Sequence, residues 1–221
     1  MTVRLQSVRR TRGLPCAAFV LTAAFSACGG SDNDSARTAA DSQAAHVAEV
    51  AAAGGVVDSI LPMAEQLRRF REGMTAPDGL RSAEGSRDAL AARWLRAIAE
   101  SDTTTLNALL LDRAEFAYLY FPSSPMATPP YEAPPQLLWG QILASSNDGL
   151  PKMLRRFAGK SLSAPTLSCP DSGVVEGENR TWSRCELSFR VNGAETVRGR
   201  FFGTIVERGG RFKFLGYANE L

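Results

Sequence analysis

The spacing of apolar residues changes near Leu162, and this change constrains the fold more than any other feature of the sequence. Before it, apolar residues recur at helical intervals, whereas from Cys185 to Val191 they alternate with polar residues. Asn192-Gly193 and Arg208-Gly209-Gly210 then supply tight turns between strands. Helices followed by an antiparallel meander define the α+β class, so we expect N-terminal helices packed on a curved C-terminal antiparallel sheet.

The helical part is divided by capping residues and prolines. The spacing predicts six helices, which start near Ile60, Ser86, Asp102, Asp112, Pro135 and Asp148. Between the fourth and fifth helices, the segment from Phe121 to Pro135 is rich in proline. Proline lacks an amide hydrogen, so neither a continuous helix nor a central strand can run through this segment.

The strand part contains one long strand, predicted from Glu195 to Glu207. Gly199 and Gly203 lie within it. Glycines weaken a flat strand and suit a sharp bend, so we expect a strongly curved, cone-like sheet. Shorter strands are expected near 164–169 and 173–177, before the hairpin.

The N-terminus is typical of a secretory leader. Four arginines and no acidic residue occupy positions 1–13, and an apolar run follows from Leu14 to Ala27. This run is shorter than the roughly 20 residues that a membrane-spanning helix needs. Phe25-Ser26-Ala27-Cys28 resembles the lipobox of bacterial lipoproteins, although that family usually has leucine where Phe25 stands. The resemblance implies that Cys28 becomes lipidated, and secretion without a lipid is the alternative.

The remaining cysteines form a pair. Once Cys16 leaves with the leader and Cys28 takes a lipid, Cys169 and Cys185 are left, and an oxidising compartment favours a disulfide between them. A metal site lacks partners, because His46 is the only histidine and two cysteines do not complete a tetrahedral zinc shell. We therefore expect neither a metal nor a cofactor.

These features divide the chain into three parts: a signal peptide (1–27), a lipidated flexible tether (28–57) and one α+β domain (58–221). The tether is rich in Gly, Ser, Ala, Asp and Asn. Without the four leader arginines, 21 basic and 23 acidic side chains remain, so the mature charge is nearly balanced. A balanced surface offers no electrostatic footprint for nucleic acid.

The order of helices and bent strands is similar to the nuclear transport factor 2-like (cystatin-like) fold, a cone of helices against a curved sheet. The resemblance covers about residues 86–221 and is architectural. The segments 115–123 and 208–217 also resemble those of uncharacterised envelope proteins, which implies no particular activity. In the resembled fold a ligand often occupies the mouth of the cone.

The sequence contains no phosphate loop, dinucleotide fingerprint, hydrolase elbow or zinc helix, and the predicted domain has no histidine for a catalytic triad. We assign no catalytic residue. Aromatic and charged side chains around the proline-rich segment are candidate pocket residues, although each also suits an ordinary core, cap or surface role. They are Glu115, Tyr118, Tyr120, Tyr131, Glu132, Trp139 and Arg156. A basic patch on neighbouring strands is a further candidate, with cross-strand ion pairing as the preferred interpretation; it comprises Arg198, Arg200, Arg211 and Lys213.

The preferred hypothesis is a non-enzymatic lipoprotein, exported and held at the membrane through its lipid, facing the periplasm or the cell exterior. Its domain would bind a small ligand or another envelope component. The resemblance leaves two alternatives. One is a small-molecule isomerase or hydrolase that uses a carboxylate in the cone, and the other is an assembly module whose sheet face joins a second copy or a partner.

Overall fold

The computed structural model describes residues 41–42, 45–46, 48–50, 52–54, 61–170 and 172–220, and the chain divides into two units, Met1–Ser59 and Ile60–Leu221. In the first unit the described residues between 41 and 50 are helical, and His46 among them is exposed. The sequence interpretation assigned no helix to this part of the tether. Its many alanines account for the difference, because alanine has the highest helix propensity. The predicted leader and Cys28 lie outside the described residues.

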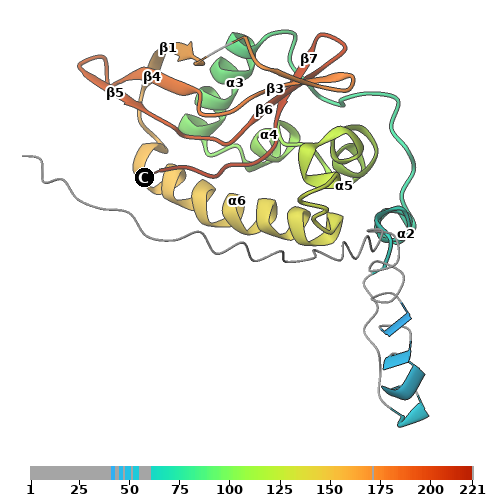
Figure 1. Cartoon of the computed structure of the whole chain (residues 1–221). Helices are drawn as coiled ribbons and strands as arrows, with labels where there is room; N and C mark the ends of the chain where they lie inside the picture. Colours follow the sequence, from blue (N-terminus) through green and yellow to red (C-terminus); the bar gives the residue numbers. More distant parts are fainter. Residues whose placement is uncertain are drawn as a thin grey trace, which may run out of the picture. The chain divides into compact units, whose positions relative to one another are not determined.

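The second unit runs from helices to strands, which confirms the predicted α+β class (Figure 1). Its α-helices are α2 (Met63–Phe70), α3 (Arg87–Glu100), α4 (Thr103–Ala108), α5 (Arg113–Glu115) and α6 (Pro135–Phe157). The predicted caps at Ser86, Asp102 and Asp112 are all used. Each side chain accepts a hydrogen bond from an amide that has no partner within the helix. Because this bond involves only neighbouring residues, the local sequence was enough to predict where these helices begin.

Two expectations about the helices were wrong. α2 begins at Met63, after Pro62, instead of near Ile60. α6 is one helix of 23 residues, and Asp148 does not cap a new one; its carboxylate accepts from Lys152 Nζ at 2.7 Å within the helix. Pro151 also lies inside α6. Because Asn147 and Pro151 are both exposed, water can reach the carbonyl that proline leaves without a donor, so the helix continues.

The proline-rich segment folds as predicted, without α-helix or strand from 121 to 134. One short turn, η1 (Phe116–Tyr120), precedes the segment, and two more, η2 (Phe121–Ser123) and η3 (Pro125–Ala127), lie within it. The first is a π-helical turn and the other two are 3-10 turns. They lead the chain from α5 into α6 (Figure 1).

In the part of the chain that the structure describes, seven strands form two antiparallel sheets. The first has the order β1 (Leu162–Ser168), β4 (Glu186–Val191), β5 (Glu195–Gly199). The second has the order β2 (Val174–Glu176), β3 (Asn179–Trp182), β6 (Ile205–Arg208), β7 (Arg211–Phe214). The turns at Asn192-Gly193 and Gly209-Gly210 have positive φ at both central residues, the geometry that tight hairpins prefer.

The two sheets meet at a break in one long hairpin. β4 pairs with β5 and β3 pairs with β6, and the ladder is interrupted between Trp182 and Glu186 on one side and between Gly199 and Ile205 on the other. The predicted bend is confirmed, and the prediction of one unbroken strand is wrong. Phe201 and Phe202 are 1% and 3% exposed. Successive residues of a flat strand point to opposite faces, and the break lets both rings turn into the same hydrophobic cluster.

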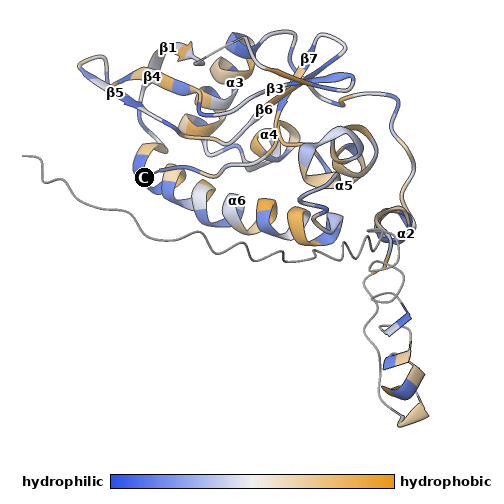
Figure 2. Cartoon of the chain, viewed as in Figure 1, coloured by the Kyte–Doolittle hydropathy of each residue, from blue (hydrophilic) through white to orange (hydrophobic). Residues whose placement is uncertain are grey.

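Two hydrophobic clusters fill the interior. The first joins α3, α4 and the C-terminal half of α6 to both sheets, and the second joins α2, η1, η2 and the N-terminal half of α6 to β6. Hydrophobic and hydrophilic residues are interleaved along α3, α6 and the strands, as expected for elements with one buried face (Figure 2). Aromatic rings dominate the first cluster, where Trp94 stacks on Phe201 and Phe157 meets Phe189 edge-on.

Candidate functional site

The seven candidate pocket residues predicted around the proline-rich segment do not converge on one cavity. Glu115 is fully buried, and Tyr120 is 9% exposed. Tyr118 and Trp139 are half-buried, and Trp139 packs 5.1 Å from the Phe116 ring. The other three are exposed, with Tyr131 at 63%; they are Tyr131, Glu132 and Arg156.

Glu115 belongs to a buried charged cluster in which every acceptor is used. Its Oε2 accepts from Lys213 Nζ at 2.7 Å and from the Asp112 amide at 2.9 Å, and its Oε1 accepts from the Arg81 amide at 2.5 Å. Lys213 is 3% exposed and Glu115 is 0% exposed. We call these four residues the saturated cluster. Buried charges persist only when paired and hydrogen-bonded, so this cluster serves structure and leaves no group for a ligand.

Asp112 completes the saturated cluster at the surface. Burial raises the pKa of its carboxyl, but the Glu115 amide and the Arg81 guanidinium outweigh burial and hold that pKa below its ordinary value. The Arg81 Nη2 atom lies 2.5 Å from Asp112 Oδ2. The α5 start is therefore fastened to Arg81 on one side and to β7, through Lys213, on the other.

The tyrosines of the predicted set serve packing. The Tyr118 hydroxyl donates to the Met74 carbonyl at 3.4 Å, and the Arg71 guanidinium lies 4.4 Å from its ring centre. Burial, with the negative charge of Glu176 in second place, raises the pKa of Tyr120 to about 12. A phenol with so high a pKa stays protonated at neutral pH, so Tyr120 supplies no general base there.

The space between helices and sheets, where the resemblance places a ligand, is filled by side chains. Fully buried rings and aliphatic groups occupy it, among them Trp94, Phe157, Phe189, Phe201 and Leu90. The recesses described below open instead on the outer surface of the second unit.

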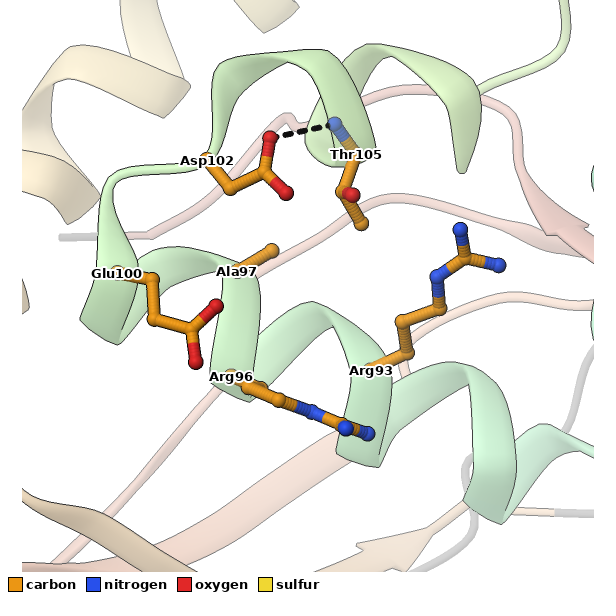
Figure 3. A pocket seen from close by; sticks show the side chains of 6 residues that line it. All are labelled: Arg93, Arg96, Ala97, Glu100, Asp102 and Thr105. Carbon is orange, nitrogen blue, oxygen red and sulfur yellow. Dashed lines mark hydrogen bonds between the residues drawn. The ribbon is translucent and has the colours of Figure 1, made fainter.

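One shallow recess of about 240 Å³ lies between α3 and α4. Figure 3 shows Arg93, Arg96 and Glu100 on α3 facing the start of α4, where Asp102 accepts from the Thr105 amide. Arg93 pairs with Glu84 at 2.6 Å, and Asp102 caps its helix. Two of the four charged residues that line this recess therefore have structural partners, and the recess carries both positive and negative charges.

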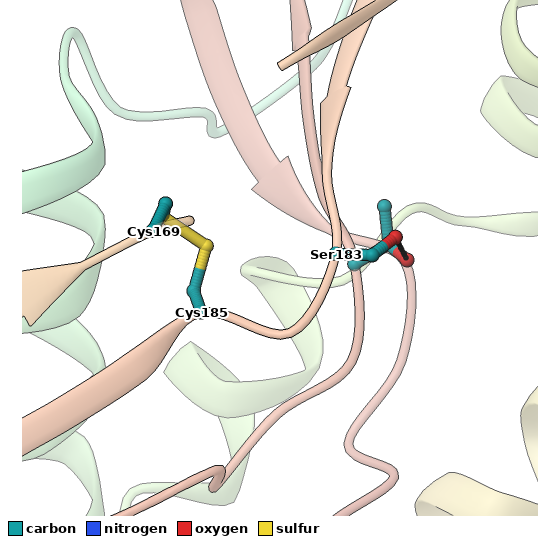
Figure 4. Close-up of a disulfide and its surroundings, with 4 residues drawn as sticks. Cys169, Ser183 and Cys185 are labelled. Carbon is teal, nitrogen blue, oxygen red and sulfur yellow. Dashed lines mark hydrogen bonds between the residues drawn. A yellow bond between two sulfur atoms is a disulfide. The ribbon is translucent and has the colours of Figure 1, made fainter. Parts of the chain in front are cut away.

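A second recess, of about 360 Å³, borders the disulfide. The sulfur atoms of Cys169 and Cys185 are 2.06 Å apart, so the predicted pair is at disulfide distance. Figure 4 shows this bridge joining the chain just after β1 to the chain just before β4. We call this the disulfide recess, and it is lined by Ser168, Pro170, Arg184, Glu186 and Arg200. Four of these five residues are sequence neighbours of a cysteine, so the bridge holds the walls of the recess in place.

A third recess, of about 210 Å³, shares Arg184 and Arg200 with the disulfide recess. We call it the terminal recess, because the C-terminal residues 218–220 form one wall. The side-chain oxygen of Asn219 is buried in this wall and has no hydrogen-bond partner within the described residues. A buried acceptor without a donor is costly to the fold.

The two arginines differ in their partners. Arg200 pairs with Glu220 at 2.7 Å, and the neighbouring Glu186 pairs with Arg198 at 2.5 Å. Arg184 forms no ion pair or hydrogen bond with any residue that the structure describes, and it has a φ of 57°. A left-handed backbone at a residue other than glycine is a small store of strain, and such residues concentrate at functional sites.

The strand arginines do not form the alternative basic patch. Arg198 pairs across the strands with Glu186, as preferred from the sequence, and Lys213 is buried in the saturated cluster. Arg211 donates to the Ala83 carbonyl. Of the four residues in the predicted patch, Arg200 alone lines the disulfide recess and the terminal recess.

Sequence reasoning missed Arg184 and Asn219. A usable signal existed for Arg184, because it directly precedes Cys185 and a predicted disulfide fixes its neighbours in space. Asn219 offered no local signal, since its position depends on where the last residues pack. Within the described residues, no group of three or more His, Cys, Asp or Glu side chains is placed to hold a metal ion.

Comparisons with protein-family models, with curated proteins and with solved structures find no match to this chain. Among the residues described by the structure, no helix is both long and apolar enough to cross a bilayer.

Proposed function

We propose that the protein is an exported lipoprotein whose folded domain binds a small anionic ligand where the disulfide recess and the terminal recess adjoin. The observation that carries this proposal is Arg184, a guanidinium without a partner among the described residues, at the junction of the two recesses. An arginine presents donors in a rigid fork that matches a carboxylate or phosphate. Arg200 lies on the same junction and adds a second guanidinium.

The two recesses favour an anion that also carries hydroxyl groups. Arg184 and Arg200 match a carboxylate or phosphate, and Asn219 and Thr204 add polar side chains to the lining of the terminal recess. The hydroxyls of Ser183 and Thr204, 3.0 Å apart across the strand break, lie beside the same junction. Volumes of about 210 and 360 Å³ suit one small molecule. A sugar acid or a sugar phosphate has this combination of groups.

Binding can be tested by calorimetry on the full chain with galacturonate, glucose 6-phosphate and neutral glucose as probes. We expect the anionic probes to bind and glucose to bind at least tenfold more weakly, since only the anions engage the guanidinium groups (about tenfold per 1.4 kcal/mol). Replacing Arg184 with glutamine should weaken anion binding by about tenfold or more. Preference for galacturonate or for glucose 6-phosphate distinguishes a carboxylate from a phosphate ligand.

Arg155 supplies the matched control, because it is exposed on α6 and is absent from the lining of both recesses. Arg155→Gln removes the same charge and should leave anion binding unchanged. Equal losses in the two variants would mean that net charge alone attracts the anion, and equal binding of glucose and the anions would reject the proposal.

The export part of the proposal rests on the leader sequence, on Cys28 and on the disulfide. Two acyl chains at Cys28 would give stable anchoring, which a single chain does not. We expect globomycin to block processing and palmitate to label the chain. Cys28→Ala should abolish labelling while Cys16→Ala, in the leader, keeps it. Labelling that survives Cys28→Ala would reject anchoring without affecting the binding site.

A further inference from the structure

The N-terminal half of α6 exposes a face without charge. Every residue from 133 to 147 is uncharged, and Glu132 and Asp148 border this run on either side. The exposed side chains along it include two leucines, Leu137 at 54% and Leu143 at 41% exposed. We call the exposed residues on this side of the helix the outward face: Gln136, Leu137, Gly140, Leu143, Ala144 and Asn147.

The outward face differs from the other long exposed helix surfaces of this protein. On α2, exposed Arg68 and Arg69 form ion pairs with Glu65, and the C-terminal half of α6 exposes Asp148 and Arg155. A solvent-facing helix surface normally carries such charges. The absence of charge over three turns, with two leucines exposed, sets the outward face apart from these other helix surfaces.

The opposite side of α6 is firmly packed, so the outward face is presented in a fixed orientation. Leu138, Trp139 and Ile142 pack against the second hydrophobic cluster. The Ser146 hydroxyl accepts from the Tyr217 amide at 3.0 Å. A partner therefore meets a preorganised helix, which lowers the entropic cost of binding.

The two exposed leucines are placed symmetrically about Gly140. Leu137 lies three residues before this glycine and Leu143 three residues after it, which places the leucines about 60° to either side of it around the helix. The charged residues at the borders are Glu132, which precedes the helix, and Asp148, which lies within it. A Cβ on Gly140 would have no atom within 4 Å, so open space lies at the centre of the face.

We infer that the outward face binds a second copy of this chain, with two α6 helices crossing antiparallel at Gly140 about a two-fold axis. Leu137 of one copy then meets Leu143 of the other, and the reverse contact follows from the symmetry. The glycine allows the helices to approach to about 8 Å. Both copies contribute an uncharged surface, so no charge is buried. This inference is independent of the anionic ligand proposed above.

Sedimentation equilibrium of the full chain carrying Cys28→Ala, which removes the lipid, measures the dimer directly. We expect a monomer–dimer equilibrium, and Leu137→Gln with Leu143→Gln should weaken it at least tenfold by removing buried apolar area. Both leucines are exposed in the single copy, so the substitutions should leave the unfolding midpoint unchanged at concentrations where the parent chain is a monomer. A monomer at every concentration, or a dimer that survives both substitutions, would overturn the inference.

Disulfide trapping tests the geometry. A residue on a two-fold axis faces its own copy, so Gly140→Cys should form a covalent dimer under mild oxidation. Ser145→Cys is the matched control, because Ser145 is exposed on the same helix but points away from the outward face. Trapping at both positions, or at Ser145 alone, would reject the crossing at Gly140. Vesicle binding that is lost in the leucine variants of a strictly monomeric chain would assign the face to a lipid surface and overturn the dimer.

Discussion

The saturated cluster and the disulfide recess both bring arginine or lysine close to glutamate, yet they differ in what they can do. In the saturated cluster, Glu115 accepts from three donors and Lys213 is enclosed with it. In the disulfide recess, Arg184 is exposed and has no partner within the described residues. The comparison shows that pairing and burial, and not the type of residue, separate a charge that holds the fold from a charge that can hold a ligand.

The largest expected effect is a loss of stability when the saturated cluster loses a charge. Lys213→Met leaves the Glu115 carboxylate buried without its cationic partner, and such a loss costs about 3–5 kcal/mol of unfolding free energy. Urea denaturation measures it. Adding Glu115→Gln to the same chain should recover part of the loss, since no charge then remains buried. Arg184→Gln should change stability by less than about 0.5 kcal/mol, and a larger loss there would erase the distinction between the two regions.

An intermediate effect is expected from removal of the disulfide that borders the disulfide recess. Replacing Cys169 and Cys185 with alanine opens a loop with a sequence separation of 16 and should cost about 3 kcal/mol. The same change should weaken anion binding by the folded protein, because four lining residues adjoin the cysteines.

Leu106→Ala gives a control of similar stability loss, because Leu106 is fully buried on α4 and far along the chain from the recess. If its folded fraction bound the anion as weakly as the cysteine variant, loss of stability and not loss of the bridge would explain the weaker binding.

The smallest effect concerns Glu176, a carboxylate that falls between the two cases. Its Oε2 atom is buried without a partner among the described residues, and its Oε1 lies 3.3 Å from the Thr181 hydroxyl. Burial raises the pKa of Glu176 above the ordinary 4.5, although Thr181 lowers it in part. The folded state therefore holds this proton more tightly than the unfolded state does. Its contribution to stability is complete below pH 4.5 and is lost as the pH rises through the raised pKa.

Denaturation midpoints across this pH range, for the parent chain and Glu176→Gln, measure that contribution. Between about pH 4 and pH 7, the free energy of unfolding should fall less in the glutamine variant than in the parent, because glutamine has no carboxyl group to titrate. Parallel curves for the two chains would show that the Glu176 carboxylate is as well satisfied as that of Glu115.

Local signals explain which parts of the structure the sequence predicted. The caps at Ser86, Asp102 and Asp112 and the turn at Asn192-Gly193 depend on a few adjacent residues, and all four are present. The pairing of Cys169 with Cys185 was predicted because these two cysteines remain once Cys16 is assigned to the leader and Cys28 to the lipid. The continuity of α6 through Pro151 was missed, because it depends on solvent access to one carbonyl.

The site was harder to predict because its contacts join distant segments. The predicted pocket assumed that Tyr131 and Glu115 share one environment, whereas one is exposed and the other is buried against β7. Arg184 and Arg200 line the same two recesses because each lies in the break of the long hairpin, one on either side of it. No local pattern encodes such a meeting.

The position of Tyr217 near the end of the chain has a consequence for the order of folding. Its hydroxyl donates to the Leu106 carbonyl at 2.6 Å, and its carbonyl oxygen occupies the space that a side chain at Gly149 would need. The core is thus closed by a contact with a sequence separation of 111 residues. A contact of such long range forms late in folding, because the cost of closing its loop has to be met by contacts that form before it.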